Sequence, residues 1–181
     1  MSGPKVFIAT VNAGAIPGSH WTQKSSVGGG RIIGEGCHFI DLLRFLAGCP
    51  AIKVQVSEPI EAGGAAVATH DTVTVTLTFE DGSVGTIHYL ANGHKSFPKE
   101  RIEVFAGGRV IQVDNFRKMS AYGWSSFKKL NLMVQDKGQN EATQAFVTAI
   151  RDGKSSPIPF EELIEVARLT LDVAASLGVK V

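Results

Sequence analysis

The segment from residue 72 to residue 90 constrains the fold more than any other part of the 181-residue chain. Four apolar residues alternate with four threonines between Thr72 and Phe79, and the turn Glu80–Ser83 leads into a second apolar-rich run, Val84–Leu90. A period of two places the apolar side chains on one face of a strand and the threonines on the other. The segment therefore predicts a β-hairpin with one buried face.

Other periodic runs extend this hairpin into a larger α+β fold. Further strands are predicted at Val6–Val11, Ile52–Val56, Glu100–Ala106 and Arg109–Asp114. Helical spacing predicts helices over Arg31–Leu46, Glu141–Arg151 and Pro159–Leu177, with a loop at 61–68 and irregular chain at 115–138. The predicted fold is an open, mostly antiparallel sheet of about six strands with helices on one face. We expect a second copy of the chain to cover the threonine-bearing face, giving a homo-oligomer.

Composition indicates a single domain with a packed core. The chain is 44% hydrophobic and 19% charged, and residues 1–181 are interpreted as one domain. A net charge of +1 without a basic cluster argues against nucleic-acid binding, and no apolar run is long enough to span a membrane. The start of the sequence lacks a signal-peptide pattern, so a cytoplasmic location is expected. Cys37 and Cys49 match no zinc or redox spacing.

A run of three glycines at positions 28 to 30 invites comparison with a dinucleotide-binding loop. That loop needs G-x-G-x-x-G directly after a strand, but Ile33 stands at the third glycine position here and the nearest predicted strand is distant. We therefore expect no cofactor-binding residues within this chain.

The segment Gly28–Gly48 carries the strongest concentration of reactive groups. Glu35, His38 and Asp41 follow one another at intervals of three, so a helix places them on one face. Flanking carboxylates can hold a histidine in one tautomer near neutral pH, which suits general acid–base work on a hydroxyl or carbonyl. The alternative is a glycine-capped helix with a partly buried, purely structural histidine. A metal site would need further ligands, and none is expected.

Four segments together resemble the C-terminal domain of the Gfo/Idh/MocA family (glucose–fructose oxidoreductase, inositol dehydrogenase and rhizopine catabolism). The resemblance spans Val11 to Leu177. Its strongest piece is the family pattern of paired glycines followed by G-x-H-x-I-D and L-x-G. The four segments are Gly29–Gly48, Phe79–Ile87, Glu103–Asn115 and Phe146–Gly153.

The resemblance implies a glyceraldehyde-3-phosphate dehydrogenase-like C-terminal domain that acts on a sugar or polyol. NAD or NADP would be bound by an N-terminal Rossmann domain, which this chain lacks, and the substrate would lie between that domain and the open side of the sheet. His38 would aid proton transfer, with Glu35 as the second candidate catalytic residue. The family's Glu-Lys-Pro lysine is missing, so the isolated chain is expected to be inactive.

One position departs from the family pattern. The aspartate four residues before the histidine is replaced by Gly34, and Glu35 is the candidate to take over its role. This departure favours an alternative in which the domain is a non-catalytic sugar-binding or dimerisation module.

Five residues are candidates for substrate binding because they are polar and lie near strand ends or on the histidine helix. The alternatives are that Asn12 only forms an Asx turn and that Asn92, His94 and Lys95 only belong to a solvated loop. The candidates are Asn12, Asp41, Asn92, His94 and Lys95.

Overall fold

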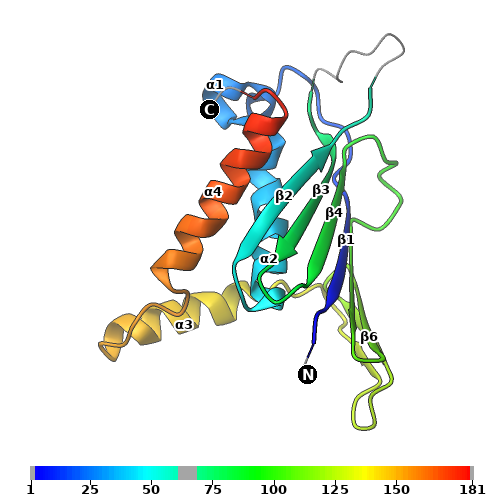
Figure 1. Ribbon diagram of the computed structural model, residues 1–181, viewed down its shortest axis with the longest axis vertical. Helices are drawn as coiled ribbons and strands as arrows, with labels where there is room; N and C mark the ends of the chain where they lie inside the picture. The colour runs from blue at the N-terminus through cyan, green and yellow to red at the C-terminus, as the bar shows by residue number, and fades with distance from the viewer. Residues whose placement is uncertain (1–2, 61–68, 180–181) are drawn as a thin grey trace.

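A computed structural model describes residues 3–60 and 69–179, and it shows an α+β fold (Figure 1). The predicted loop at 61–68 lies outside the described residues. The strands are β1 Val6–Asn12, β2 Ala51–Ser57, β3 Thr72–Phe79, β4 Val84–Leu90, β5 Glu100–Ala106, β6 Arg109–Asp114, β7 Lys118–Tyr122 and β8 Lys129–Asn131. The helices are α1 Ser25–Gly28, α2 Cys37–Ala47, α3 Gln139–Arg151 and α4 Phe160–Ser176, with a 3₁₀ turn at Trp21–Gln23 and a π-helical turn at Ile32–Gly36.

The strands form one open sheet in the order β2-β3-β4-β1-β5-β6-β7-β8. β1 lies in the middle, parallel to β4 and antiparallel to β5, and the other neighbours are antiparallel. The predicted hairpin is confirmed, because β3 and β4 pair across the turn with Thr76 opposite Thr86.

The expected number of strands was too low. The described part of the sheet has eight strands, because the segment predicted to be irregular contains β7 and β8. Both are short and lie at one edge of the sheet, and every residue of β8 is exposed. A strand that buries so little has no reason to alternate apolar with polar residues, so sequence periodicity did not reveal it.

Helices α2 and α4 pack on one face of the sheet, as predicted (Figure 1). The β-hairpin turns its apolar face toward them, and Gly85 on β4 allows the closest approach. A Cβ at Gly85 would lie 2.7 Å from Cδ1 of Leu43 on α2. The shared core is made of Phe7, Val11, Ile40, Leu43, Val73, Val75, Leu77, Phe79, Ile87, Tyr89, Leu169 and Val173.

None of the described helices packs on the other face of the sheet (Figure 1). Strand register brings five apolar residues of this face next to one another across β4, β1, β5, β6 and β7. This apolar row consists of Val84, Val6, Phe105, Val110 and Tyr122.

Among the described helices, none is long and apolar enough to cross a membrane.

Candidate functional site

The entry to α2 is a π-helical turn rather than the regular helix that the sequence predicted from Arg31. This turn, Ile32–Gly36, contains Glu35 and leads directly into His38. π-Turns are rare and occur frequently at functional sites. Gly34 lies in the turn, and a Cβ added there would meet no atom within 4 Å.

Glu35 is held by three donors that arrive from different parts of the chain. Lys99 Nζ donates to its Oε1 at 2.7 Å, and Tyr89 Oη donates to its Oε2 at 2.6 Å. Arg31 Nη2 also donates to Oε2, at 3.1 Å. Arg31 is itself buried and donates to the backbone oxygens of Ala13 and Gly14. The carboxylate therefore joins the start of α2 to β4 and to the residue before β5.

These bonds fix the charge of Glu35. Burial raises the pKa of Glu35, but the hydrogen bonds from Lys99, Tyr89 and Arg31 and the Lys99 charge outweigh burial and lower the pKa to about 2. Burial and the bond to Glu35 raise the pKa of Tyr89 far above its ordinary value. Across the physiological pH range Glu35 therefore stays negatively charged and Tyr89 keeps its proton. This makes Glu35 an anchor for Lys99 rather than a group that exchanges protons near neutral pH.

The low pKa of Glu35 predicts an acid-dependent loss of stability. The carboxyl titrates near 4.5 when unperturbed and near 2 in the fold, so its contribution is complete above pH 4.5 and disappears as pH falls toward 2. Solvent reaches the Lys99 side of the network, so we expect a contribution of about 1–2 kcal/mol. Urea unfolding of Glu35→Gln and wild type should differ by that amount at pH 7 and converge near pH 2. The exposed Glu80→Gln control should match wild type throughout, and a constant gap for Glu35→Gln would contradict the assignment.

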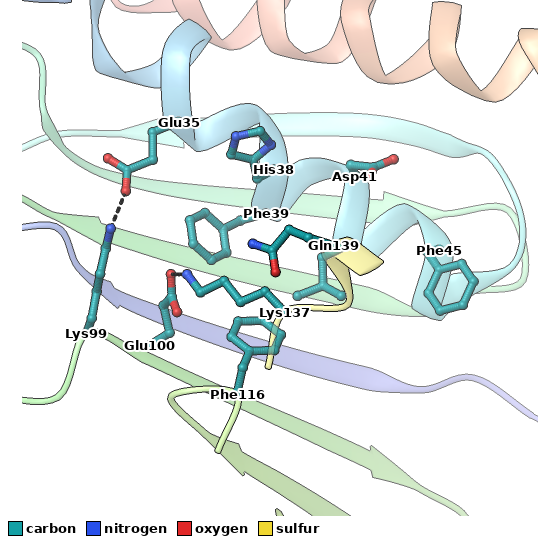
Figure 2. A pocket seen from close by; sticks show the side chains of 11 residues that line it. Glu35, His38, Phe39, Asp41, Phe45, Lys99, Glu100, Phe116, Lys137 and Gln139 are labelled. Atoms are coloured by element: carbon teal, nitrogen blue, oxygen red, sulfur yellow. Dashed lines mark hydrogen bonds and ion pairs between the residues drawn. The ribbon is translucent and has the colours of Figure 1, made fainter. Parts of the chain in front are cut away.

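Beside this network lies a cavity of about 540 Å³, the size of a small-molecule site. Figure 2 shows Glu35, His38 and Asp41 on the helix, opposite Lys99 and Glu100 at the start of β5. Of the predicted site residues, the structure thus brings these three helix residues together. The remaining lining residues are Phe39, Leu42, Phe45, Phe116, Lys137 and Gln139.

His38 and Asp41 are the cavity groups best suited to exchange protons. The His38 side chain is exposed and lines the cavity without a bond to Glu35 or Asp41 among the described residues. Burial raises the pKa of Asp41, and the charge of Glu162 raises it further, while His38 and Arg44 oppose the shift. An accessible imidazole can take a proton from a bound hydroxyl or return one to a carbonyl.

The other predicted substrate-binding residues lie away from this cavity. Asn12 ends β1 and is buried, and its Nδ2 donates to the backbone oxygens of His94 and Phe97 at 2.9 and 3.1 Å. It thereby fixes the loop between β4 and β5. Asn92, His94 and Lys95 are exposed on that loop, and none of them lines the cavity.

The cavity also lies on the other side of the sheet from the one that the resemblance implied. Ile102 is buried with the helices, and Glu100 is two residues away on the same face of β5. The cavity is therefore on the helix side of the sheet, between α2 and the start of β5.

Sequence reasoning missed most of the residues that complete this site. Arg31 stands four residues before Glu35, a spacing that could have indicated their ion pair. Lys99, Glu100 and Lys137 carried no local signal, because they meet the helix only through the sheet topology.

The glycine run does not form a strand-to-helix phosphate loop. Gly28 ends the short helix α1, and a Cβ there would lie 2.8 Å from the backbone oxygen of Trp21. Gly29 and Gly30 adopt φ values of +68° and +82°, which favour glycine. These glycines serve packing and turning, so the described residues do not fit a pyrophosphate at this position.

The fold is an open sheet covered on one face by α2 and α4, with a histidine-bearing cavity at the helix entry. The sequence model for the Gfo/Idh/MocA C-terminal domain matches residues 5–109, more than half of the chain. The chain therefore belongs to the Gfo/Idh/MocA family. No curated protein matches it in sequence.

Solved structures show the same fold at low sequence identity. An NAD-binding oxidoreductase from Klebsiella pneumoniae is 19% identical with a TM-score of 0.73, and it covers 98% of this chain and 57% of its own. The aldose–aldose oxidoreductase from Caulobacter crescentus, complexed with glycerol, is 16% identical with a TM-score of 0.70, covering 96% and 54%. UDP-N-acetylglucosamine 3-dehydrogenase from Acidithiobacillus ferrooxidans is 17% identical with a TM-score of 0.69, covering 96% and 54%. The chain spans about half the length of these proteins.

Proposed function

We propose that this chain is the substrate-side domain of an NAD(P)-dependent oxidoreductase that acts on a sugar or polyol. The observation that carries the proposal is the cavity, which presents an exposed His38 beside two ion-paired lysines within the family fold. Known members with this fold include an NAD-binding oxidoreductase and a sugar-nucleotide dehydrogenase. A separate N-terminal domain would hold the nicotinamide, because the glycine run of this chain serves local packing.

In this proposal His38 carries the proton of the reaction. The chemistry that a nicotinamide held by the other domain would supply is acceptance of a hydride from the substrate carbon. The imidazole of His38 takes the proton of the hydroxyl group on the same carbon. The electron pair of the broken O–H bond then forms the second bond of the C=O group. His38 then releases the proton to water through the open side of the cavity. Glu35 stays ionised throughout and holds Lys99 at the cavity wall.

An assay with and without the cofactor domain tests this function. The chain alone should give no hydride transfer, and the chain joined to a nicotinamide-binding domain should reduce NAD or NADP with a panel of hexoses and polyols. Turnover by the chain alone would contradict the division of roles. Sugar binding without any transfer in the joined protein would favour a second function.

That second function is a non-catalytic sugar-binding module. Gly34 leaves open space where the family places an aspartate, and Glu35 cannot serve as a base near neutral pH because its pKa is about 2. His38 would then only hydrogen-bond the ligand. The joined-protein assay separates the two functions.

We also propose that the chain forms a homo-oligomer through its open sheet face. Val6, Phe105 and Tyr122 are 48, 39 and 58% exposed, and they lie in the apolar row that crosses five strands. Replacing Phe105 by glutamate places a charge in that row and should convert the oligomer into a monomer in sedimentation velocity. Glu161→Gln, an exposed change on α4, should leave the sedimentation coefficient unchanged. A wild-type monomer would contradict this proposal.

A further inference from the structure

Glu35 is shared between two cations, and this leaves one side of the cavity with excess positive charge. Arg31 Nη2 lies 3.1 Å from Glu35 Oε2, and Lys99 Nζ lies 2.7 Å from Glu35 Oε1. Among the described residues, no other carboxylate forms an ion pair with either cation. Two positive groups therefore share one negative charge. A negative charge that develops on a ligand beside Lys99 would meet a favourable potential.

The ammonium group of Lys99 can donate to a ligand in the cavity. The Lys99 side chain is 46% exposed and lines the cavity (Figure 2). An ammonium has three N–H donors, and among the described residues this one is bonded only to Glu35. Lys137 differs, because its ammonium pairs with the buried Glu100 and lies 5.5 Å from the centre of the Phe116 ring. Lys99 is therefore the better placed of the two cavity lysines to contact a ligand.

The backbone and the side chain of Lys99 are each held by a separate group. Asn12 N donates to the Lys99 backbone oxygen at 2.7 Å, so the end of β1 holds this residue in place. Glu35 fixes the ammonium and is held in turn by Tyr89 and Arg31. An ion pair that solvent reaches contributes little to stability, so a fixed Lys99 serves the fold only weakly. Donors that are positioned before a reaction stabilise charge that develops on an oxygen atom.

Lys99 and His38 face the same cavity from opposite walls. His38 lies one turn after Glu35 on the helix, and Lys99 reaches Glu35 from the start of β5 (Figure 2). Asp41 lies on the far side of His38 from Glu35. A substrate oxygen that gives its proton to His38 would therefore become negative in the part of the cavity that carries the excess positive charge.

We propose that Lys99 is a second catalytic residue, which donates a hydrogen bond to the substrate oxygen that loses its proton to His38. This inference rests on the proposed function. The proton passes from the hydroxyl group to the imidazole, the electron pair of that O–H bond forms the second bond of the C=O group, and the hydride leaves the carbon for the nicotinamide. Lys99 keeps its proton throughout and stabilises the oxygen while negative charge collects there. Sequence analysis did not single out Lys99.

Removing the ammonium group from the joined protein tests the proposal. Lys99→Ala should lower the single-turnover rate of hydride transfer by about 10²–10³-fold, while the affinity for the substrate changes by less than about tenfold. Lys154→Ala is the matched control and should keep the wild-type rate, because Lys154 is an exposed lysine that pairs with Asp152 and does not line the cavity. If Lys99→Ala does not fold, Lys99→Met, which keeps most of the side-chain stem, should show the same loss.

Added cations separate hydrogen-bond donation from charge balance. Methylammonium carries N–H donors and should raise the transfer rate of Lys99→Ala by at least about tenfold. Tetramethylammonium has the same charge but no N–H donor, so it should not raise the rate. The substrate in these experiments is a polyol, because amines condense with the aldehyde form of a sugar.

Three results would overturn the inference. They are a folded Lys99→Ala variant whose transfer rate stays within about threefold of wild type, a loss that neither cation restores, and equal restoration by the two cations. Each of these results leaves the proposed function standing, because the wild-type joined protein still transfers hydride. A wild-type joined protein without hydride transfer would instead remove the proposed function, and this inference with it.

Discussion

Replacing His38 by alanine in the protein that joins this chain to a nicotinamide-binding domain should lower kcat by about 10²–10⁴-fold. His38 is the exposed imidazole of the cavity, and Glu35 cannot replace it because three donors keep that carboxylate ionised. The affinity for the sugar should change far less than kcat, because the substrate would keep its contacts with the rest of the cavity. Steady-state kinetics and a separate binding titration check this split.

A matched variant controls for the loss of a histidine. His20 is exposed and does not line the cavity, so His20→Ala should keep kcat within about twofold of wild type. A His38→Ala enzyme that keeps wild-type kcat would contradict the proton-carrier role. A loss of binding with unchanged kcat would assign His38 to ligand recognition.

The largest loss of stability should follow from replacing Arg44 by methionine. Arg44 is 7% exposed on α2, and its Nε donates to Glu165 Oε2 on α4 at 2.7 Å. The other oxygen of Glu165 accepts from the backbone N–H of Ala51 on β2 at 2.7 Å, and Glu162 lies 3.8 Å from the guanidinium. One guanidinium thus joins α2 to α4 and, through Glu165, to the edge strand.

Methionine keeps much of the side-chain volume but leaves Glu165 without its cation. Removing one partner of a buried pair costs 3–5 kcal/mol, and the partial exposure of Glu165 lowers our expectation to about 3 kcal/mol, or roughly 10 °C in Tm. Arg151→Met is the control, since Arg151 is 69% exposed in its pair with Asp152 and should cost under about 1 kcal/mol. Calorimetry showing equal losses for the two variants would contradict the buried-pair account.

The parts of the fold that bury one face were predictable from sequence. β3 and β4 alternate apolar and polar residues because one side packs on the helices, and the predicted strand bounds at Val84–Leu90 are confirmed. β7 and β8 bury little, so nothing in their sequence required alternation. The parallel pairing of β1 with β4 joins Val6 to Val84 and left no local trace.

The residues of the site were also only partly predictable from sequence. Glu35, His38 and Asp41 were predictable as a group because a helix turns a spacing of three into a shared face. Their bonding was not predictable, since the partners of Glu35 come from β4 and from the residue before β5. Glu100 and Lys137 meet only because the loop after β8 returns to the start of β5. Such contacts depend on topology rather than on sequence spacing.

Deuterium transfer tests the central claim most directly. The joined protein would be incubated with NAD, or separately with NADP, and a panel of hexoses and polyols deuterated on carbon, and the nicotinamide would be analysed by NMR and mass spectrometry. The account predicts deuterium on the reduced nicotinamide ring in the wild type and a rate lower by about 10²–10⁴-fold in His38→Ala. Sugar that binds in the cavity without any transfer of deuterium would contradict it and assign the domain to binding alone.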